Sequence, residues 1–176
     1  MVAILEMKIL NDFNTSVEKA LDEIDLKWRE YEGLIICGTH SPEKIDPNQQ
    51  IGFIRMAREQ RIPFLGICFG HQLAAIEYAR NVLGISNATS EEFGQGTFIV
   101  RKRLQGLKIG HDIVDGESYW NNYEVIPELS GVDARNGSFW KKPPHFITCQ
   151  YHPEYQSSKD KPHPLLVKFI ELCKTK

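Results

Sequence analysis

The sequence predicts an α/β fold in which a mostly parallel central sheet carries helices on both faces and a small antiparallel insertion. Short apolar segments alternate along the chain with longer amphipathic ones, as buried parallel strands alternate with their crossover helices. In the middle of the chain, turn residues instead separate consecutive strand-like segments, which is typical of antiparallel pairing. The 176 residues fit one domain, spanning 1–176.

The first half of the chain supplies three strands and three helices in alternation. Strands are predicted where short segments are apolar, at residues 2–9, 31–37 and 64–68. Helices are predicted where apolar residues recur at helical spacing, at residues 16–24, 47–60 and 69–84. The first helix follows a cap-like Asn14-Thr15-Ser16, and Gly84 is suited to the end of the third.

The second half contains the insertion and then returns to the central sheet. Strand-like segments at 97–116 and 119–126, with turn residues between them, form the predicted antiparallel insertion. The apolar segment 146–151 is expected to rejoin the core as a strand, and residues 164–173 to form the closing helix.

Composition and charge exclude several classes of function. Hydrophobic residues make up 41% of the chain and charged residues 25%, which is ordinary for a globular protein. With a formal net charge of −2, neither nucleic acid nor a membrane is expected as a partner. Every apolar run is far shorter than the roughly 20 residues that span a bilayer. Glu6 and Lys8 interrupt the apolar start, which therefore suggests a first strand rather than a cleaved leader.

The four cysteines indicate a reducing compartment. Cys37, Cys68, Cys149 and Cys173 have neither CxxC nor metal-type spacing. A cytoplasmic protein with free thiols, no metal site and no cofactor is therefore expected.

One cysteine stands at a strand–helix junction, in the segment Gly66-Ile67-Cys68-Phe69-Gly70. Flanking glycines allow a sharp turn with close packing, and a nucleophile on such a turn projects at a helix N-terminus that favours a thiolate. The N–H of Phe69 would then point toward a developing oxyanion. A structural cysteine in a tight turn explains this segment equally well.

A second segment provides a base for that thiol. Gln150-Tyr151-His152-Pro153-Glu154 follows the predicted strand 146–151, so it opens at the same carboxyl edge of the sheet as Cys68. Glu154 is placed to bond one imidazole nitrogen of His152 and leave the other for the thiol. The two segments together favour a Cys68-His152-Glu154 triad. The remaining histidines, His40, His71, His111, His145 and His163, lack such pairing and are expected to be structural or solvated.

These residues resemble the class I (triad) glutamine amidotransferases and, within them, the glutaminase domain of CTP synthases. The likeness rests on "PFLGICFGHQLAAIEYARNVLG" with "NATSEEF", and on "CQYHPEYQSSKDKPHPL". It continues more weakly through "VAILE", "EGLIICG" and "YWNNYEV". It implies the flavodoxin-like, three-layer fold of that family and hydrolysis of glutamine by Cys68 through a glutamyl thioester. It also implies that His152 moves the protons while Glu154 orients it.

The resemblance assigns further residues by matching position. Gly38, Thr39 and Phe69 would form the oxyanion hole, and Gln72, Glu92, Asn122 and Tyr123 would hold the substrate. Two of these positions depart from the family. Thr39, like Ser41, stands where the family has glycine, and Asn122 stands where it has an arginine for the substrate's α-carboxylate. An amide cannot supply the charged fork of a guanidinium, so either another group binds the α-carboxylate or the substrate is not free glutamine.

The partner expected from the resemblance is an ammonia acceptor. The chain contains no phosphate-binding G-x-x-x-x-G-K-[ST] loop, so the expectation is a glutaminase without the synthetase domain, serving a separate synthetase subunit. Two alternatives stay open. One is a catalytically impaired relative that binds or regulates. The other, which lacks the hydrolysis, is a flavodoxin-like chaperone or deglycase relative.

Overall fold

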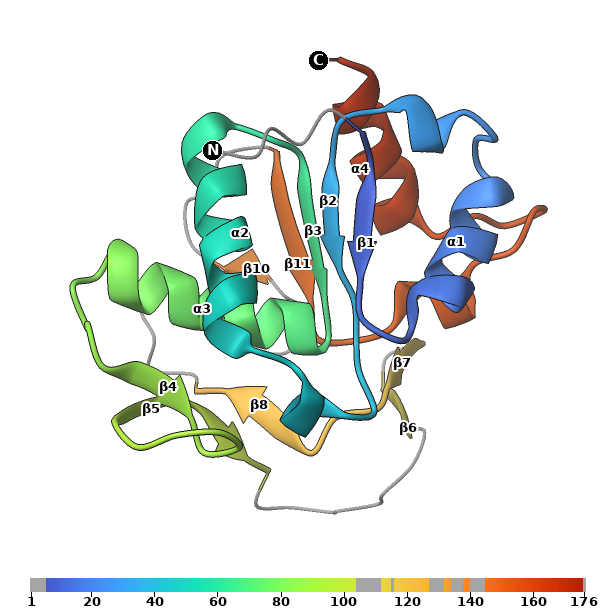
Figure 1. Cartoon of the computed structure of the whole chain (residues 1–176). Helices are drawn as coiled ribbons and strands as arrows, with labels where there is room; N and C mark the ends of the chain where they lie inside the picture. Colours follow the sequence, from blue (N-terminus) through green and yellow to red (C-terminus); the bar gives the residue numbers. More distant parts are fainter. Residues whose placement is uncertain are drawn as a thin grey trace.

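The computed structural model describes residues 6–103, 112–114, 116–126, 132–133, 138–139 and 145–175. Its centre is a four-stranded sheet in the order β1-β2-β3-β11, and every neighbouring pair is parallel. These strands are β1 Lys8–Leu10, β2 Leu34–Ile36, β3 Phe64–Ile67 and β11 Phe146–Cys149. Helices α2 and α3 cover one face of the sheet, and α1 and α4 cover the other (Figure 1). The predicted three-layer α/β class is therefore confirmed.

The four helices are α1 Asn14–Asp22, α2 Pro47–Gln60, α3 Phe69–Asn81 and α4 Pro164–Lys174. Local caps explain where α2 begins and ends. The Asp46 carboxylate accepts from the N–H groups of Asn48 and Gln49, Pro47 occupies the first turn, and Arg61 ends the helix at φ 58°. Within the described residues, no helix is both long and apolar enough to cross a membrane.

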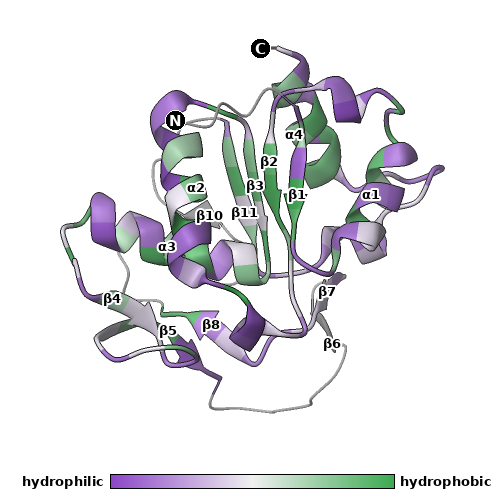
Figure 2. Cartoon of the chain, viewed as in Figure 1, coloured by the Kyte–Doolittle hydropathy of each residue, from purple (hydrophilic) through white to green (hydrophobic). Residues whose placement is uncertain are grey.

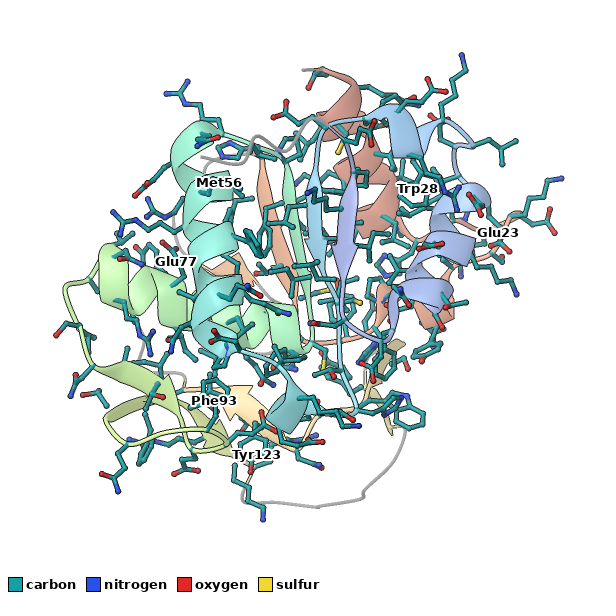
Figure 3. All side chains as sticks on the ribbon, in the orientation of Figure 1. Glu23, Trp28, Met56, Glu77, Phe93 and Tyr123 are labelled. Atoms are coloured by element: carbon teal, nitrogen blue, oxygen red, sulfur yellow. The ribbon has the colours of Figure 1, made fainter. Side chains whose placement is uncertain are left out.

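Strands β2, β3 and β11 are buried on both faces, so they contain almost only apolar residues, whereas Lys8 in the edge strand β1 is exposed. In β3, Phe64 packs against the α2 and α3 side, whereas Leu65 and Ile67 pack against the α1 and α4 side. Figure 2 shows the hydrophobic strands between helices that turn their polar faces outward. Trp28 and Met56, labelled in Figure 3, belong to the cores on opposite faces of the sheet.

The predicted antiparallel pairing in the insertion is confirmed between β5 and β8 and between β6 and β7, and an additional parallel strand, β4, makes the first of these a mixed sheet. Its strands are β4 Ala88–Ser90, β5 Thr97–Lys102 and β8 Tyr123–Val125. Strand β4 pairs with β5 in parallel, and residues 91–96 connect the two strands, while β5 and β8 are antiparallel. Two separate antiparallel pairs also form, from β6 Asp112–Val114 with β7 Glu117–Tyr119 and from β9 Val132–Asp133 with β10 Ser138–Phe139.

Several predicted boundaries differ from the observed ones. Strand β11 ends at Cys149, before the polar residues that line the sheet edge, and α3 ends at Asn81, ahead of Gly84. Helix α1 begins at Asn14 without a side-chain cap, so the predicted cap is wrong. Residues 2–5 and 104–111 of the predicted strands lie outside the described residues. Single turns of 3₁₀ helix complete the fold, η1 Trp28–Glu30, η2 Pro42–Lys44 and η3 Pro153–Gln156.

Candidate active site

Cys68 is the single residue between β3 and α3, so the chain turns from strand to helix at this position. Its dihedrals are φ 52° and ψ −102°, a conformation that costs a residue with a Cβ of order 1–3 kcal/mol. The Cys68 N–H donates to the carbonyl of Cys149 on β11 at 2.8 Å, which ties the turn to the sheet. The thiol thus lies at the carboxyl edge of the sheet, beside the first turn of α3.

Close backbone contacts explain the two glycines around this turn. A Cβ on Gly70 would overlap the carbonyl oxygen of Ile36 in β2, and a Cβ on Gly66 would lie 2.9 Å from the Gly70 carbonyl oxygen. Side-chain carbons do not approach a backbone oxygen so closely. The Gly-x-Cys-x-Gly spacing therefore lets α3 rest directly on the backbone of β2 and β3.

His152 follows β11 and is held from three sides. Its Nδ1 lies 2.7 Å from Glu154 Oε1, and both side chains are fully buried. The His152 N–H donates to the Ser118 carbonyl at 2.7 Å. The imidazole packs between Phe13 and Tyr155, with ring centroids 4.9 and 5.5 Å away. The carboxylate therefore fixes the tautomer and orientation of the ring.

The remaining imidazole nitrogen, Nε2, is buried and has no formed hydrogen bond among the described residues. Burial disfavours the charged imidazole, but the neighbouring Cys68 thiolate and the Glu154 carboxylate outweigh burial and raise the pKa of His152. Because Nε2 and the sulfur make no well-aligned hydrogen bond, we attribute the influence of the thiolate to its charge. Cys68, His152 and Glu154 thus form one electrostatically coupled group.

Gln150, which the sequence analysis did not single out, contacts the thiol directly. Its Nε2 donates to Cys68 Sγ at 3.6 Å, and its Oε1 accepts from Gln72 Nε2 at 3.3 Å. Gln72 Nε2 also donates to the Tyr123 carbonyl at 2.9 Å, so the Oε1 of Gln72 is its remaining polar atom. The Trp120 carbonyl lies 4.0 Å from the sulfur. The position of Gln150 in the strand-end motif was its only sequence signal.

The loop after β2, residues 37–41, passes beside His152. None of its residues has a left-handed φ. Thr39 and Ser41 therefore occupy positions that do not require glycine, and their side chains cause no backbone strain. Gly38 is needed for space, because a Cβ there would lie 2.9 Å from His152 Cε1 and 3.2 Å from Phe13 Cδ2.

Most amides of this loop are already occupied. The His40 N–H donates to the Asp12 carboxylate at 3.1 Å, and the Ser41 N–H donates to Thr39 Oγ1 at 3.0 Å. Among the described residues, no acceptor takes the N–H of Gly38, Thr39 or Phe69. All three amides are therefore available as donors of the predicted oxyanion hole.

Glu92 lies in the turn after β4, and its neighbour Phe93 connects that turn to the thiol. The Phe93 ring packs edge-on against Phe69, the residue after Cys68, with centroids 6.2 Å apart. Figure 3 shows Phe93 and Tyr123 on the same side of the molecule, at the mixed sheet. Burial, reinforced by the charge of Glu43, raises the pKa of Glu92.

Asn122 and Tyr123 form hydrogen bonds through their backbone carbonyl groups. The Asn122 carbonyl accepts from the Arg103 N–H at 3.0 Å, and the Tyr123 carbonyl accepts from Asn121 Nδ2 at 2.9 Å in addition to Gln72. The structure therefore joins Tyr123 to the thiol through Gln72 and Gln150. Within the described residues, no hydrogen bond links the Asn122 side chain to this network.

The other histidines stand apart from the thiol. His163 caps α4 and lies 3.1 Å from Glu117, and His71 is buried in the first turn of α3. His40 is exposed, and His111 lies outside the described residues. In the part of the chain that the structure describes, no cluster of three His, Cys, Asp or Glu side chains could hold a metal ion.

A cysteine at a strand–helix turn, beside a buried histidine–carboxylate pair in a parallel α/β fold, is an arrangement that can activate a thiol nucleophile. The chain belongs to the glutamine amidotransferase class-I family, whose model matches residues 9–172.

Within this family, the chain is similar in sequence to CTP synthases. The chain is 30% identical to the CTP synthase of Methanoregula boonei and 31% identical to that of Methanoculleus marisnigri, over 98% of this chain and 43% of each relative. The chain thus spans less than half the length of these relatives. Its fold is similar to the glutaminase domain of Trypanosoma brucei CTPS with bound acivicin (TM-score 0.69, 20% identity, covering 97% of this chain and 94% of that one).

The close contacts around Gly38 and the open space around Gly52 predict opposite effects of alanine substitution on the free energy of unfolding. Gly38→Ala should lower the free energy of unfolding by about 1–3 kcal/mol, because the new methyl group displaces His152 or Phe13. Gly52→Ala, in α2 with nothing within 4 Å of its Cβ, should raise it by up to about 1 kcal/mol. Urea denaturation measures both, and a Gly38→Ala protein as stable as the wild type would contradict the close contact.

The charge coupling predicts a change in the titration of His152. Cys68→Ser removes the thiolate charge that raises the pKa of His152, so the imidazole should lose its proton at lower pH than in the wild type. Cys37→Ser is the matched control, because burial raises the pKa of the Cys37 thiol and keeps it neutral. Imidazole chemical shifts followed against pH by NMR report both variants. Identical titration of His152 in all three proteins would show that the thiolate exerts no influence.

The contact from Gln150 predicts a change in thiol reactivity. Gln150→Leu removes a hydrogen-bond donor that would stabilise negative charge on Cys68 Sγ, so alkylation of Cys68 by iodoacetamide at neutral pH should slow by at least about tenfold. Gln50→Leu serves as the control, since Gln50 is also buried but bonds Asn11 at 2.6 Å. Mass spectrometry of the labelled peptide gives the rate. Equal rates in the two variants would rule out a specific effect of Gln150.

Proposed function

We propose that the protein is a thiol amidohydrolase that cleaves the γ-amide of glutamine, or of a related γ-glutamyl amide. The observation that carries this proposal is the strained Cys68 turn beside a fully buried His152 whose Nδ1 lies 2.7 Å from Glu154. The chain's membership of the glutamine amidotransferase class-I family supports the same chemistry.

In the first half of the reaction, the Cys68 thiolate attacks the γ-carbonyl carbon. The carbonyl oxygen becomes an oxyanion that accepts hydrogen bonds from the N–H groups of Thr39 and Phe69, in a loop whose space depends on Gly38. His152 Nε2 gives its proton to the leaving nitrogen, the C–N bond breaks, and a glutamyl thioester remains on the sulfur. Glu154 stabilises the imidazolium that exists until this transfer.

In the second half, His152 acts as a base and takes a proton from water. The resulting hydroxide attacks the thioester carbon, the same two amides hold the second oxyanion, and the C–S bond breaks. Glutamate leaves and the thiolate–imidazolium pair of Cys68 and His152 is restored. The raised pKa of His152 favours this charged pair in the resting enzyme.

Two residues are suited to the amino-acid end of the substrate. Both hydrogens of Gln72 Nε2 are engaged with Tyr123 and Gln150, so Gln72 can offer only its Oε1, an acceptor for an α-ammonium group. Burial raises the pKa of Glu92, and a bound ammonium would stabilise its carboxylate. Asn122 offers the α-carboxylate an amide in place of a guanidinium, so we propose a weaker hold on free amino acids than an arginine gives.

We further propose that ammonia released by this site is consumed by a synthetase. The relatives named CTP synthase are more than twice as long as the matched region, which supports an acceptor on a further domain or on a separate subunit. Free ammonia would otherwise be lost to solvent.

The test is release of glutamate and ammonia from glutamine, and of glutamate and methylamine from γ-glutamyl methylamide. Cys68→Ala should lower turnover by at least about 10³-fold, and Glu154→Gln by about 10²- to 10⁴-fold. Cys37→Ser, which changes a second buried thiol, should retain turnover. Absence of turnover in the wild type, together with no labelling of Cys68 by a glutamine-like electrophile, would instead favour a non-catalytic relative that binds or regulates.

A further inference from the structure

Two exposed aromatic side chains meet beside the thiol. Trp120 is 44% exposed and Tyr155 is 42% exposed. They are the only aromatic members of the exposed large hydrophobic set within the described residues. Their ring centroids are 6.4 Å apart with an interplanar angle of 39°. Two aromatic surfaces left in water at the same place are a feature of ligand-binding sites.

Trp120 lies beside a reacting group through its backbone and Tyr155 through its ring. The carbonyl of Trp120 lies 4.0 Å from Cys68 Sγ, and the Tyr155 ring packs against the His152 imidazole with centroids 5.5 Å apart. Tyr155 follows Glu154 directly in η3, and Trp120 follows β7. The aromatic pair therefore extends outward from the point at which the amide bond would be broken.

Glutamine does not use such a surface. Its leaving group is ammonia, which has no carbon to bury, and the amino-acid end is assigned to Gln72 and Glu92. We propose that Trp120 and Tyr155 form a leaving-group subsite, and that the substrates are γ-glutamyl amides of amines carrying an aromatic ring. This inference rests on the proposed function and names its substrate class.

The chemistry of the cleavage fixes where the amine lies. Cys68 Sγ forms a bond to the γ-carbon while the C–N bond breaks, and His152 Nε2 supplies the proton that lets the amine depart neutral. The leaving nitrogen must therefore be next to His152, and its substituent extends past the imidazole toward Tyr155. Aromatic rings pack favourably at centroid separations of about 4.5–7 Å, so a ring on the amine can contact Tyr155 and Trp120 together.

The test compares γ-glutamyl benzylamide with γ-glutamyl methylamide. Burial of one aromatic ring should make kcat/KM for the benzylamide about 10- to 100-fold higher in the wild type. Trp120→Ala should bring this ratio close to one, and Trp120→Phe should restore part of it. Leu26→Ala, which removes a 78% exposed side chain elsewhere, should keep the wild-type ratio. A wild-type ratio near one, or equal loss in Trp120→Ala and Leu26→Ala, would overturn the subsite.

Binding to the Cys68→Ala variant separates this inference from the proposed function. Calorimetry should show the benzylamide binding about tenfold or more tightly than the methylamide, and this difference should vanish when Trp120→Ala is added. If neither amide is hydrolysed by the wild type but the binding difference is present, the hydrolase proposal fails and the aromatic subsite stands. Equal binding of the two amides would overturn the subsite.

Discussion

The site depends on how closely α3 approaches the backbone of the central sheet. A helix that begins one residue after a strand can pack on that sheet only where no side chain intervenes. Gly70 meets this requirement against Ile36, and Gly66 meets it against Gly70 itself. The link residue, Cys68, is then forced into a left-handed φ, and the packing of α3 against β2, β3 and β11 stabilises that conformation. The reactive position of the thiol is thus a consequence of the core.

The second constraint is the burial of the His152 imidazole and the Glu154 carboxylate. An imidazole and a carboxylate with no solvent exposure are stable together only because each satisfies the other, and losing one partner of such a buried pair costs about 3–5 kcal/mol. Here the neighbouring Cys68 and Glu154 side chains both raise the pKa of His152, against the effect of burial. In the proposed reaction Cys68, His152 and Glu154 act together, so the effects of removing two of them should not add.

Local signals explain what could be predicted from the sequence. Helix α2 matched its prediction at both ends because the signals are local. Asp46 and Pro47 begin the helix, and Arg61 ends it. The two strand-end motifs could be assigned to one sheet edge because parallel strands end together. The parallel pairing of β4 with β5 was missed because residues 88–90 were not predicted to form a strand. The contact of Gln150 with Cys68 was missed because it crosses from β11 to β3, a separation that no local pattern encodes.

Helix α3 also acts as a rigid spacer. Its first turn contains Phe69 and Gln72 immediately after the thiol, and the Phe69–Phe93 contact fixes the turn that contains Glu92 to the same body. In the proposed reaction, the distance between the attacking sulfur and the groups that hold the amino-acid end is therefore built into one helix. Asparagine is one methylene shorter, so it could reach either the Cys68 sulfur or the groups that hold the amino-acid end, but not both at once. Discrimination by chain length would then need neither a moving lid nor a closing domain.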